Sequence, residues 1–201
     1  ARAWDATHPG SAQLAVEIDA KLAAYVRQWF DLPRSPRLRI RIDDAVVAAP
    51  SLKAEFWDVV VRDIFSGGTV PDSVCTPEFM HSCMNALKSE GLFLINVASA
   101  PTSQVQAQFA ALAQISDFLV ISDAAVARGK RRGNLVLVAR KTGFSAEDFD
   151  RLSRAVRKLP LPAQLYRHSD GALSRYNYPG KTCGATKQYW AAVVSGAVVV
   201  Y

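Results

Sequence analysis

Acidic residues lie at or just after the ends of three short apolar segments in the first third of the chain. Glu17 lies near the end of the first segment, Asp43 and Asp44 follow the second, and Asp63 follows the third. In an open α/β sheet, ligands bind beyond the carboxyl ends of the strands. Because a carboxylate accepts hydrogen bonds through two oxygens, these residues are the first candidates for a binding site.

The first two positions suit an adenosine ligand. Glu17 could accept both ribose hydroxyls, while Asp44, next to Asp43, could accept the adenine amino group and Ala45 would leave room for the ring. A different interpretation fits two of the aspartates equally well: Asp19 and Asp44 could each cap the first turn of a helix.

Asp63 follows a strongly apolar segment and precedes a turn-rich stretch from Ser66 to Pro71. A carboxylate at the end of a central strand can act as a general base, or hold a cationic amine or sulfonium group. The alternative is an aspartate that only orders the loop.

The elements that would position these residues alternate along the chain. Apolar segments of strand length alternate with longer segments of helical period, and this pattern predicts an α/β fold with a mostly parallel, twisted sheet flanked by helices. Gly91 is expected to end one helix and open the next strand. Strands are predicted over 14–18, 38–42, 57–61, 92–97, 118–122 and 135–139, and helices over 1–6, 21–30, 77–88, 101–116 and 146–158.

The number and placement of charged residues indicate whether the protein binds nucleic acid. The chain carries 24 Lys and Arg against 18 Asp and Glu, a net charge of +6. The one dense basic cluster contains Arg128, Lys130, Arg131 and Arg132, and no aromatic residues are interleaved with it. A solvated loop is therefore the favoured interpretation, and no nucleic-acid partner is predicted.

Cysteine and histidine usage predicts neither a metal site nor a disulfide framework. The three cysteines form no C-x-x-C pair and the three histidines are scattered, which suits a reducing cytoplasm. The apolar run from Tyr189 to Tyr201 is too short to span a bilayer, so no membrane partner is expected.

Two regions are predicted. Residues 1–168 read as one α/β domain, and residues 169–201 as a C-terminal tail of unknown role, because the periodic pattern stops near Gly171.

The acidic positions and their flanking segments, taken in order, resemble the spermidine/spermine synthase family. The resemblance is strongest to its bacterial spermidine-synthase-like branch, on the class I S-adenosylmethionine-dependent methyltransferase fold, and it extends from about Ala1 to Leu165. The segments that carry it are Val16–Asp19, Asp43–Ala45, Trp57–Asp63, Thr76–Phe79 and Gly91–Val97.

The resemblance implies roles for the candidate residues. Glu17 would bind the ribose of decarboxylated S-adenosylmethionine or of S-adenosylmethionine, and Asp43, Asp44 and Ala45 would surround the adenine. Asp63 matches the catalytic aspartate, which helps to deprotonate an attacking amine such as putrescine. The expected function is aminopropyl transfer without a metal, and a homo-oligomer is among the expected partners.

Several positions depart from the family pattern. Ser66-Gly67 stands where the aminopropyltransferases carry a second aspartate and a proline, and Asn96 where a polyamine-binding glutamine is common. The family's glycine-rich loop and first strand have no counterpart in the 201 residues, nor does its N-terminal β-hairpin domain. A methyltransferase-like enzyme and a noncatalytic binding or assembly module therefore stay open as alternatives.

The missing first strand normally lies at the centre of the sheet, where unpaired backbone groups would be buried. The segment 197–201 could occupy that position from the other end of the chain. Otherwise the chain is a fragment, or a partner fills the gap.

Overall fold

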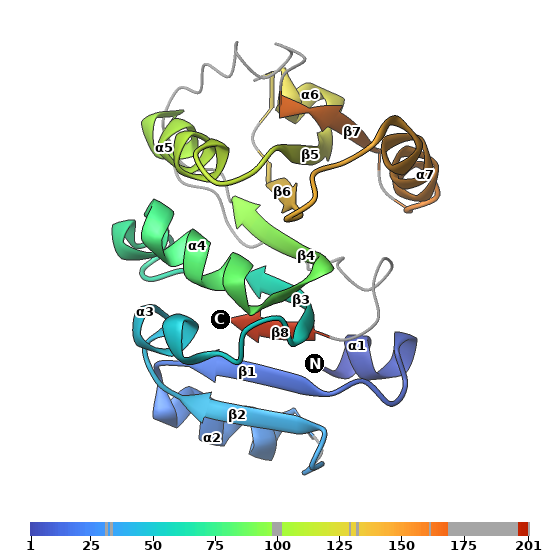
Figure 1. Ribbon diagram of the computed structural model, residues 1–201. Helices are drawn as coiled ribbons and strands as arrows, with labels where there is room; N and C mark the ends of the chain where they lie inside the picture. The colour runs from blue at the N-terminus through green and yellow to red at the C-terminus, as the bar shows by residue number, and fades with distance from the viewer. Residues whose placement is uncertain are drawn as a thin grey trace.

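A computed structural model describes residues 1–30, 32, 34–97, 102–128, 130–131, 133–160, 162–168 and 197–200. Its centre is an eight-stranded sheet (Figure 1). The strands are β1 Gln13–Glu17, β2 Leu38–Ile42, β3 Trp57–Arg62, β4 Leu87–Val97, β5 Phe118–Asp123, β6 Leu135–Ala139, β7 Ala163–Arg167 and β8 Ala197–Val200.

Helices flank this sheet on both sides. The α-helices are α1 Arg2–Thr7, α2 Ala20–Trp29, α3 Ala45–Ala48, α4 Pro77–Ala86, α5 Thr102–Ala113, α6 Ala124–Ala127 and α7 Ala146–Arg157, and Ala49–Ser51 and Asp72–Val74 form short 3-10 helices. In Figure 1, α3, α4 and α5 lie on one side of the sheet, and α1 and α7 lie on the other.

The strand order is β2-β1-β8-β3-β4-β6-β5-β7. The pairs from β2 to β4 are parallel, whereas β6 is antiparallel to β4 and β5, and β7 is antiparallel to β5. The predicted α/β architecture with a mostly parallel sheet is confirmed, and its antiparallel strands lie at one end.

The two faces of the sheet carry separate hydrophobic clusters. Val60 faces the larger cluster, which also contains Phe79 of α4 and Leu112 of α5. Its neighbours Val59 and Val61 face the smaller cluster around α1 and α7. This alternation follows from the two-residue period of a strand, and it directs Arg62, two positions after Val60, toward the side of α4 and α5.

Local capping explains where several helices begin. The Asp19 carboxylate accepts hydrogen bonds from the backbone N–H groups of Lys21 and Leu22 at the start of α2. Ser145 and Asp148 form a reciprocal capping box at the start of α7. Both helices begin within one residue of the prediction.

The predicted boundary between α4 and β4 is wrong. The helix ends at Ala86 and the strand begins at Leu87, so Gly91 lies inside β4 rather than at the end of the helix. A Cβ atom on Gly91 would lie 3.0 Å from the backbone oxygen of Trp57, beside an irregularity in the pairing with β3. Glycine is needed there for the close approach of two strands.

The central position in the sheet is occupied by β8, which pairs in parallel with β1 and with β3. This is the location considered above for the segment 197–201. Residues 169–196 and Tyr201, which make up the rest of the predicted tail, lie outside the described residues, as does Arg132 of the basic cluster. Among the helices of the described part, none is long and apolar enough to cross a membrane.

Candidate functional site

Strand register places the candidate acidic residues along one edge of the sheet, the edge formed by the carboxyl ends of the parallel strands. Val200 of β8 pairs with Val16 of β1 and also with Arg62 of β3. Glu17 and Asp63 follow these residues, so their backbones lie at the same level on either side of β8. With strands about 4.8 Å apart, the two backbones are separated by roughly 10 Å.

At this edge Glu17 is linked to the loop after β2. The backbone N–H of Asp43 donates to the carbonyl oxygen of Glu17 at 3.1 Å. The Glu17 side chain is partly buried, and its Oε1 accepts a 2.7 Å hydrogen bond from the backbone N–H of Asp19. The first two predicted positions are therefore neighbours in space.

Asp43 and Asp44 already have protein partners. Arg41 donates from Nε to Asp43 Oδ2 at 2.9 Å, while Asp43 Oδ1 accepts from the backbone N–H of Asp44. Asp44 caps α3 by accepting from the N–H of Val46 at 2.8 Å, as the helix-capping interpretation predicts. Ala45 is buried. These contacts hold the two aspartates in place just after the end of β2. Their adenine-binding role stays a prediction.

Asp63 is held by the neighbouring strand. Its Oδ1 accepts a 2.7 Å hydrogen bond from Nδ2 of Asn96, near the end of β4. The other side-chain atom, Asn96 Oδ1, accepts a 3.1 Å hydrogen bond from Nδ2 of Asn134. Because Asn134 donates to that oxygen, the amide of Asn96 presents its nitrogen to Asp63. The carboxylate therefore has a defined orientation.

Arg62, the residue before Asp63, is a buried cation. Arg62 is 0% exposed, and its guanidinium donates to the backbone oxygen of Asn96 at 2.9 Å and to Gln108 Oε1 at 2.6 Å. It also contacts Cys75 Sγ at 3.5 Å. Burial lowers the pKa of Arg62, since the charged form loses hydration. Arg62 thus ties β3 to the end of β4 and to α5.

Sequence reasoning did not identify Arg62, Gln108 or Asn134 as part of this edge. One signal was present: Arg62 directly continues an apolar segment that the pattern placed at the centre of the sheet. A charged residue in such a place must find buried partners. Gln108 and Asn134 carry no comparable local signal.

The described acidic residues at this end of the sheet do not form a metal site. Within the part of the chain that the structure describes, no group of three or more His, Cys, Asp or Glu residues could hold a metal ion. The side chains at the carboxyl ends of these strands carry carboxylate and amide oxygens, which can accept hydrogen bonds from hydroxyls and amines.

No family model matches the chain. Among curated proteins, it is 26% identical over 160 residues to the polyamine aminopropyltransferase of Neisseria meningitidis, a match that covers 79% of this chain and 59% of that protein. It is 37% identical over 87 residues to the N-terminal histidine N-methyltransferase of Emericella nidulans, which covers 41% of this chain and 15% of that protein. The matched residues thus span less than two thirds of these relatives.

The solved structures that this chain resembles are of the same kinds of protein. A probable spermidine synthase from Corynebacterium glutamicum superposes with a TM-score of 0.68 at 25% identity, covering 94% of this chain and 79% of that chain. Human methyltransferase-like protein 13, solved with SAH, has a TM-score of 0.59 at 22% identity, covering 77% of this chain and 76% of that chain. The chain therefore has the class I methyltransferase fold, and it is similar to polyamine aminopropyltransferases in sequence and to a probable spermidine synthase in structure.

Proposed function

We propose that this protein transfers an aminopropyl group from decarboxylated S-adenosylmethionine to a small amine such as putrescine. Glu17 would hold the ribose hydroxyls, and the Asp43–Ala45 turn would contact the adenine. Asp63 would receive the proton of the attacking amine. The amine nitrogen forms a bond to the methylene carbon beside the sulfonium, the carbon–sulfur bond breaks, and methylthioadenosine leaves with the electron pair.

One observation carries the proposal: the Asp63 carboxylate is fixed by Asn96 at the carboxyl end of a central strand. A carboxylate held in one orientation can align an amine for attack and take up its proton without rearranging. Glu17, at the same level two strands away, is spaced to hold the nucleoside part of the same co-substrate.

The relatives support this choice. The N. meningitidis protein is named a polyamine aminopropyltransferase, and its match extends over most of the present chain. A spermidine synthase solved in complex with the transition-state analogue AdoDATO shares the fold, with a TM-score of 0.51. The residues at the edge fit such a ligand, since carboxylate oxygens accept from ribose hydroxyls and attract the positive charge of a sulfonium or an ammonium.

A second candidate is methyl transfer from S-adenosylmethionine. It is favoured by Ser66-Gly67, which replaces the second aspartate expected of an aminopropyltransferase. The similarity to a histidine N-methyltransferase over 87 residues also favours it. Both reactions move a carbon group from a sulfonium sulfur that carries the same adenosyl group to a nitrogen, so the nucleoside contacts would be shared.

The variant Asp63→Asn tests the proposal. It keeps the shape of the side chain and removes the base, so amine-dependent release of methylthioadenosine should be lost while methylthioadenosine still binds. Asp58→Asn is the matched control, because Asp58 lies near the start of the same strand and pairs with Lys88 at 2.8 Å. Turnover that survives Asp63→Asn, or is lost equally in Asp58→Asn, would contradict the role given to Asp63.

A further inference from the structure

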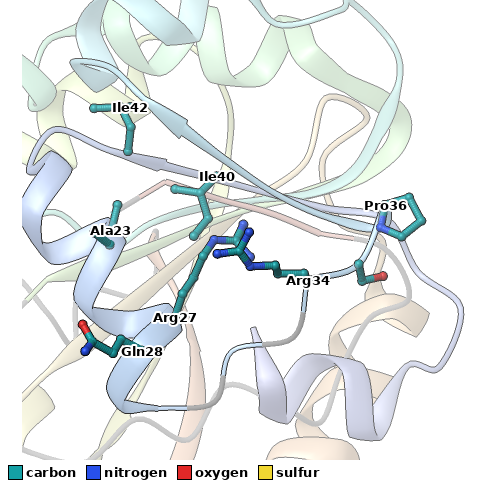
Figure 2. Close-up of a pocket in the computed structure, with 9 residues that line it drawn as sticks. Ala23, Arg27, Gln28, Arg34, Pro36, Ile40 and Ile42 are labelled. Atoms are coloured by element: carbon teal, nitrogen blue, oxygen red, sulfur yellow. The ribbon is translucent and has the colours of Figure 1, made fainter.

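A groove of about 1040 Å³ runs between α2 and the edge strand β2. Ala23 of α2 and Ile40 and Ile42 of β2 contribute apolar surface, and Pro36 closes one end (Figure 2). Its size is close to the upper end of the range of small-molecule sites, about 300–1,000 Å³. The groove can therefore hold an organic molecule with an apolar part.

Two arginines enter this groove from different elements. Arg27 comes from the last turn of α2 and Arg34 from the segment before β2, and their guanidinium groups point toward one another (Figure 2). None of the described residues that line the groove is acidic. Neither arginine forms an ion pair with any residue that the structure describes.

Like charges in this arrangement repel, and an anion between them would remove the repulsion. Arg37 adds positive charge nearby, also without an ion pair among the described residues, whereas Arg41 is neutralised by Asp43. The described residues around the groove are therefore positive, which raises the local concentration of anions.

We propose that this groove binds a small organic phosphate, with the phosphate between Arg27 and Arg34 and the organic part on Ile40 and Ile42. A guanidinium presents a planar fork of donors that matches two phosphate oxygens. A phosphate dianion has enough terminal oxygens and charge to engage two such forks, whereas a single carboxylate would neutralise only one. Gln28 and Ser35, which also line the groove, supply polar groups for the rest of the ligand.

The groove shares no lining residue with the proposed transfer site, although Ile42 pairs with Glu17 in the sheet. Side chains on a strand alternate between its two faces, so Ile40 and Ile42 face the groove while Arg39 and Arg41 face the other side. The loss of either site should leave ligand binding at the other intact.

The test is calorimetric titration with phenyl phosphate, phenol and inorganic phosphate. Phenyl phosphate should bind more tightly than inorganic phosphate, and phenol should show no binding. In Arg27→Gln/Arg34→Gln the affinity for phenyl phosphate should fall at least about tenfold, since the charge-assisted hydrogen bonds are lost. Arg39→Gln, on the opposite face of β2, is the matched control and should bind as the unaltered protein does.

Equal affinity of the double variant and the unaltered protein would overturn the proposal, as would equal binding of phenol or no binding of phenyl phosphate. The single variant Arg34→Gln gives the same comparison if the double variant does not fold. Methylthioadenosine, titrated in parallel, should bind all the variants alike, so failure of the groove and failure of the transfer site are distinguishable.

Discussion

The side-chain amide of Asn96 donates a 2.7 Å hydrogen bond to the carboxylate of Asp63, and so joins the ends of two neighbouring parallel strands. Asn134 fixes the orientation of that amide from the opposite side. In the proposed reaction, the base is therefore aligned by β4 as well as by its own strand.

Replacing Asn96 by alanine should impair the transfer reaction more than it impairs binding. Without the amide, the Asp63 carboxylate loses a fixed partner and the alignment of the amine becomes poorer. Misplacement of a reacting group by about 1 Å can lower a rate by about 10²-fold, so we expect a decrease of that order in kcat. Steady-state kinetics with decarboxylated S-adenosylmethionine and putrescine measure it.

Asn134→Ala provides the control, because it removes a contact one step further from the base. Its kcat should fall less than that of Asn96→Ala. If Asn96→Ala kept full kcat, the hydrogen bond to Asp63 would have no part in the reaction.

Arg62 and Gln108 should stabilise the protein as a coupled pair. Arg62→Met leaves Gln108 Oε1 and the carbonyl of Asn96 without their buried donor, and each unpaired group costs roughly 1–3 kcal/mol. Gln108→Leu likewise removes a partner from a buried cation. Urea unfolding of both single variants and the double variant should give a coupling free energy of about 0.5–3 kcal/mol, and additive losses would contradict the coupling.

The capping box of α7 should make stability depend on acid pH. The hydrogen bond from Arg140 and the backbone N–H of Ser145 lower the pKa of Asp148 from 3.8 to about 2. Since the folded-state pKa is the lower one, the stabilisation is complete above about pH 4 and is lost as the pH falls through 2. The difference in unfolding free energy between the unaltered protein and Asp148→Asn should therefore shrink over that interval.

The matched variant for this titration is Glu90→Gln, which removes the second, more exposed carboxylate on Arg140, at 3.0 Å. It should change the stability less than Asp148→Asn at neutral pH. A difference for Asp148→Asn that stayed constant from pH 5 to pH 2 would show that its ion pair makes no contribution, because most of the expected loss falls between the ordinary pKa of 3.8 and the folded-state pKa of about 2.

Much of the fold could be predicted because the local signals agree with the global structure. A strand is predicted over 38–42, and β2 has those bounds, with apolar and basic residues alternating along it. A helix is predicted from residue 146, and α7 begins there, capped by Ser145. In each case the side chains that decide the conformation are close in sequence.

The remaining features depend on contacts between distant residues. Gly91 resembles a helix-ending glycine, yet its role is set by the backbone of Trp57 on another strand. Asn96, which donates to Asp63, lies 33 residues away along the chain, and Gln108, which accepts from Arg62, lies 46 residues away. No periodicity or spacing in the sequence reports such pairs, so the acidic positions could be predicted and their hydrogen-bonding partners could not.

Calorimetric titration of methylthioadenosine into the unaltered protein and into Glu17→Gln tests the central claim most directly. If Glu17 holds the ribose of the proposed co-substrate, the unaltered protein binds the nucleoside, and Glu17→Gln binds it about ten- to a hundredfold more weakly because a charge-assisted hydrogen bond is lost. Absence of heat with the unaltered protein, or equal affinities of the two proteins, would contradict the account.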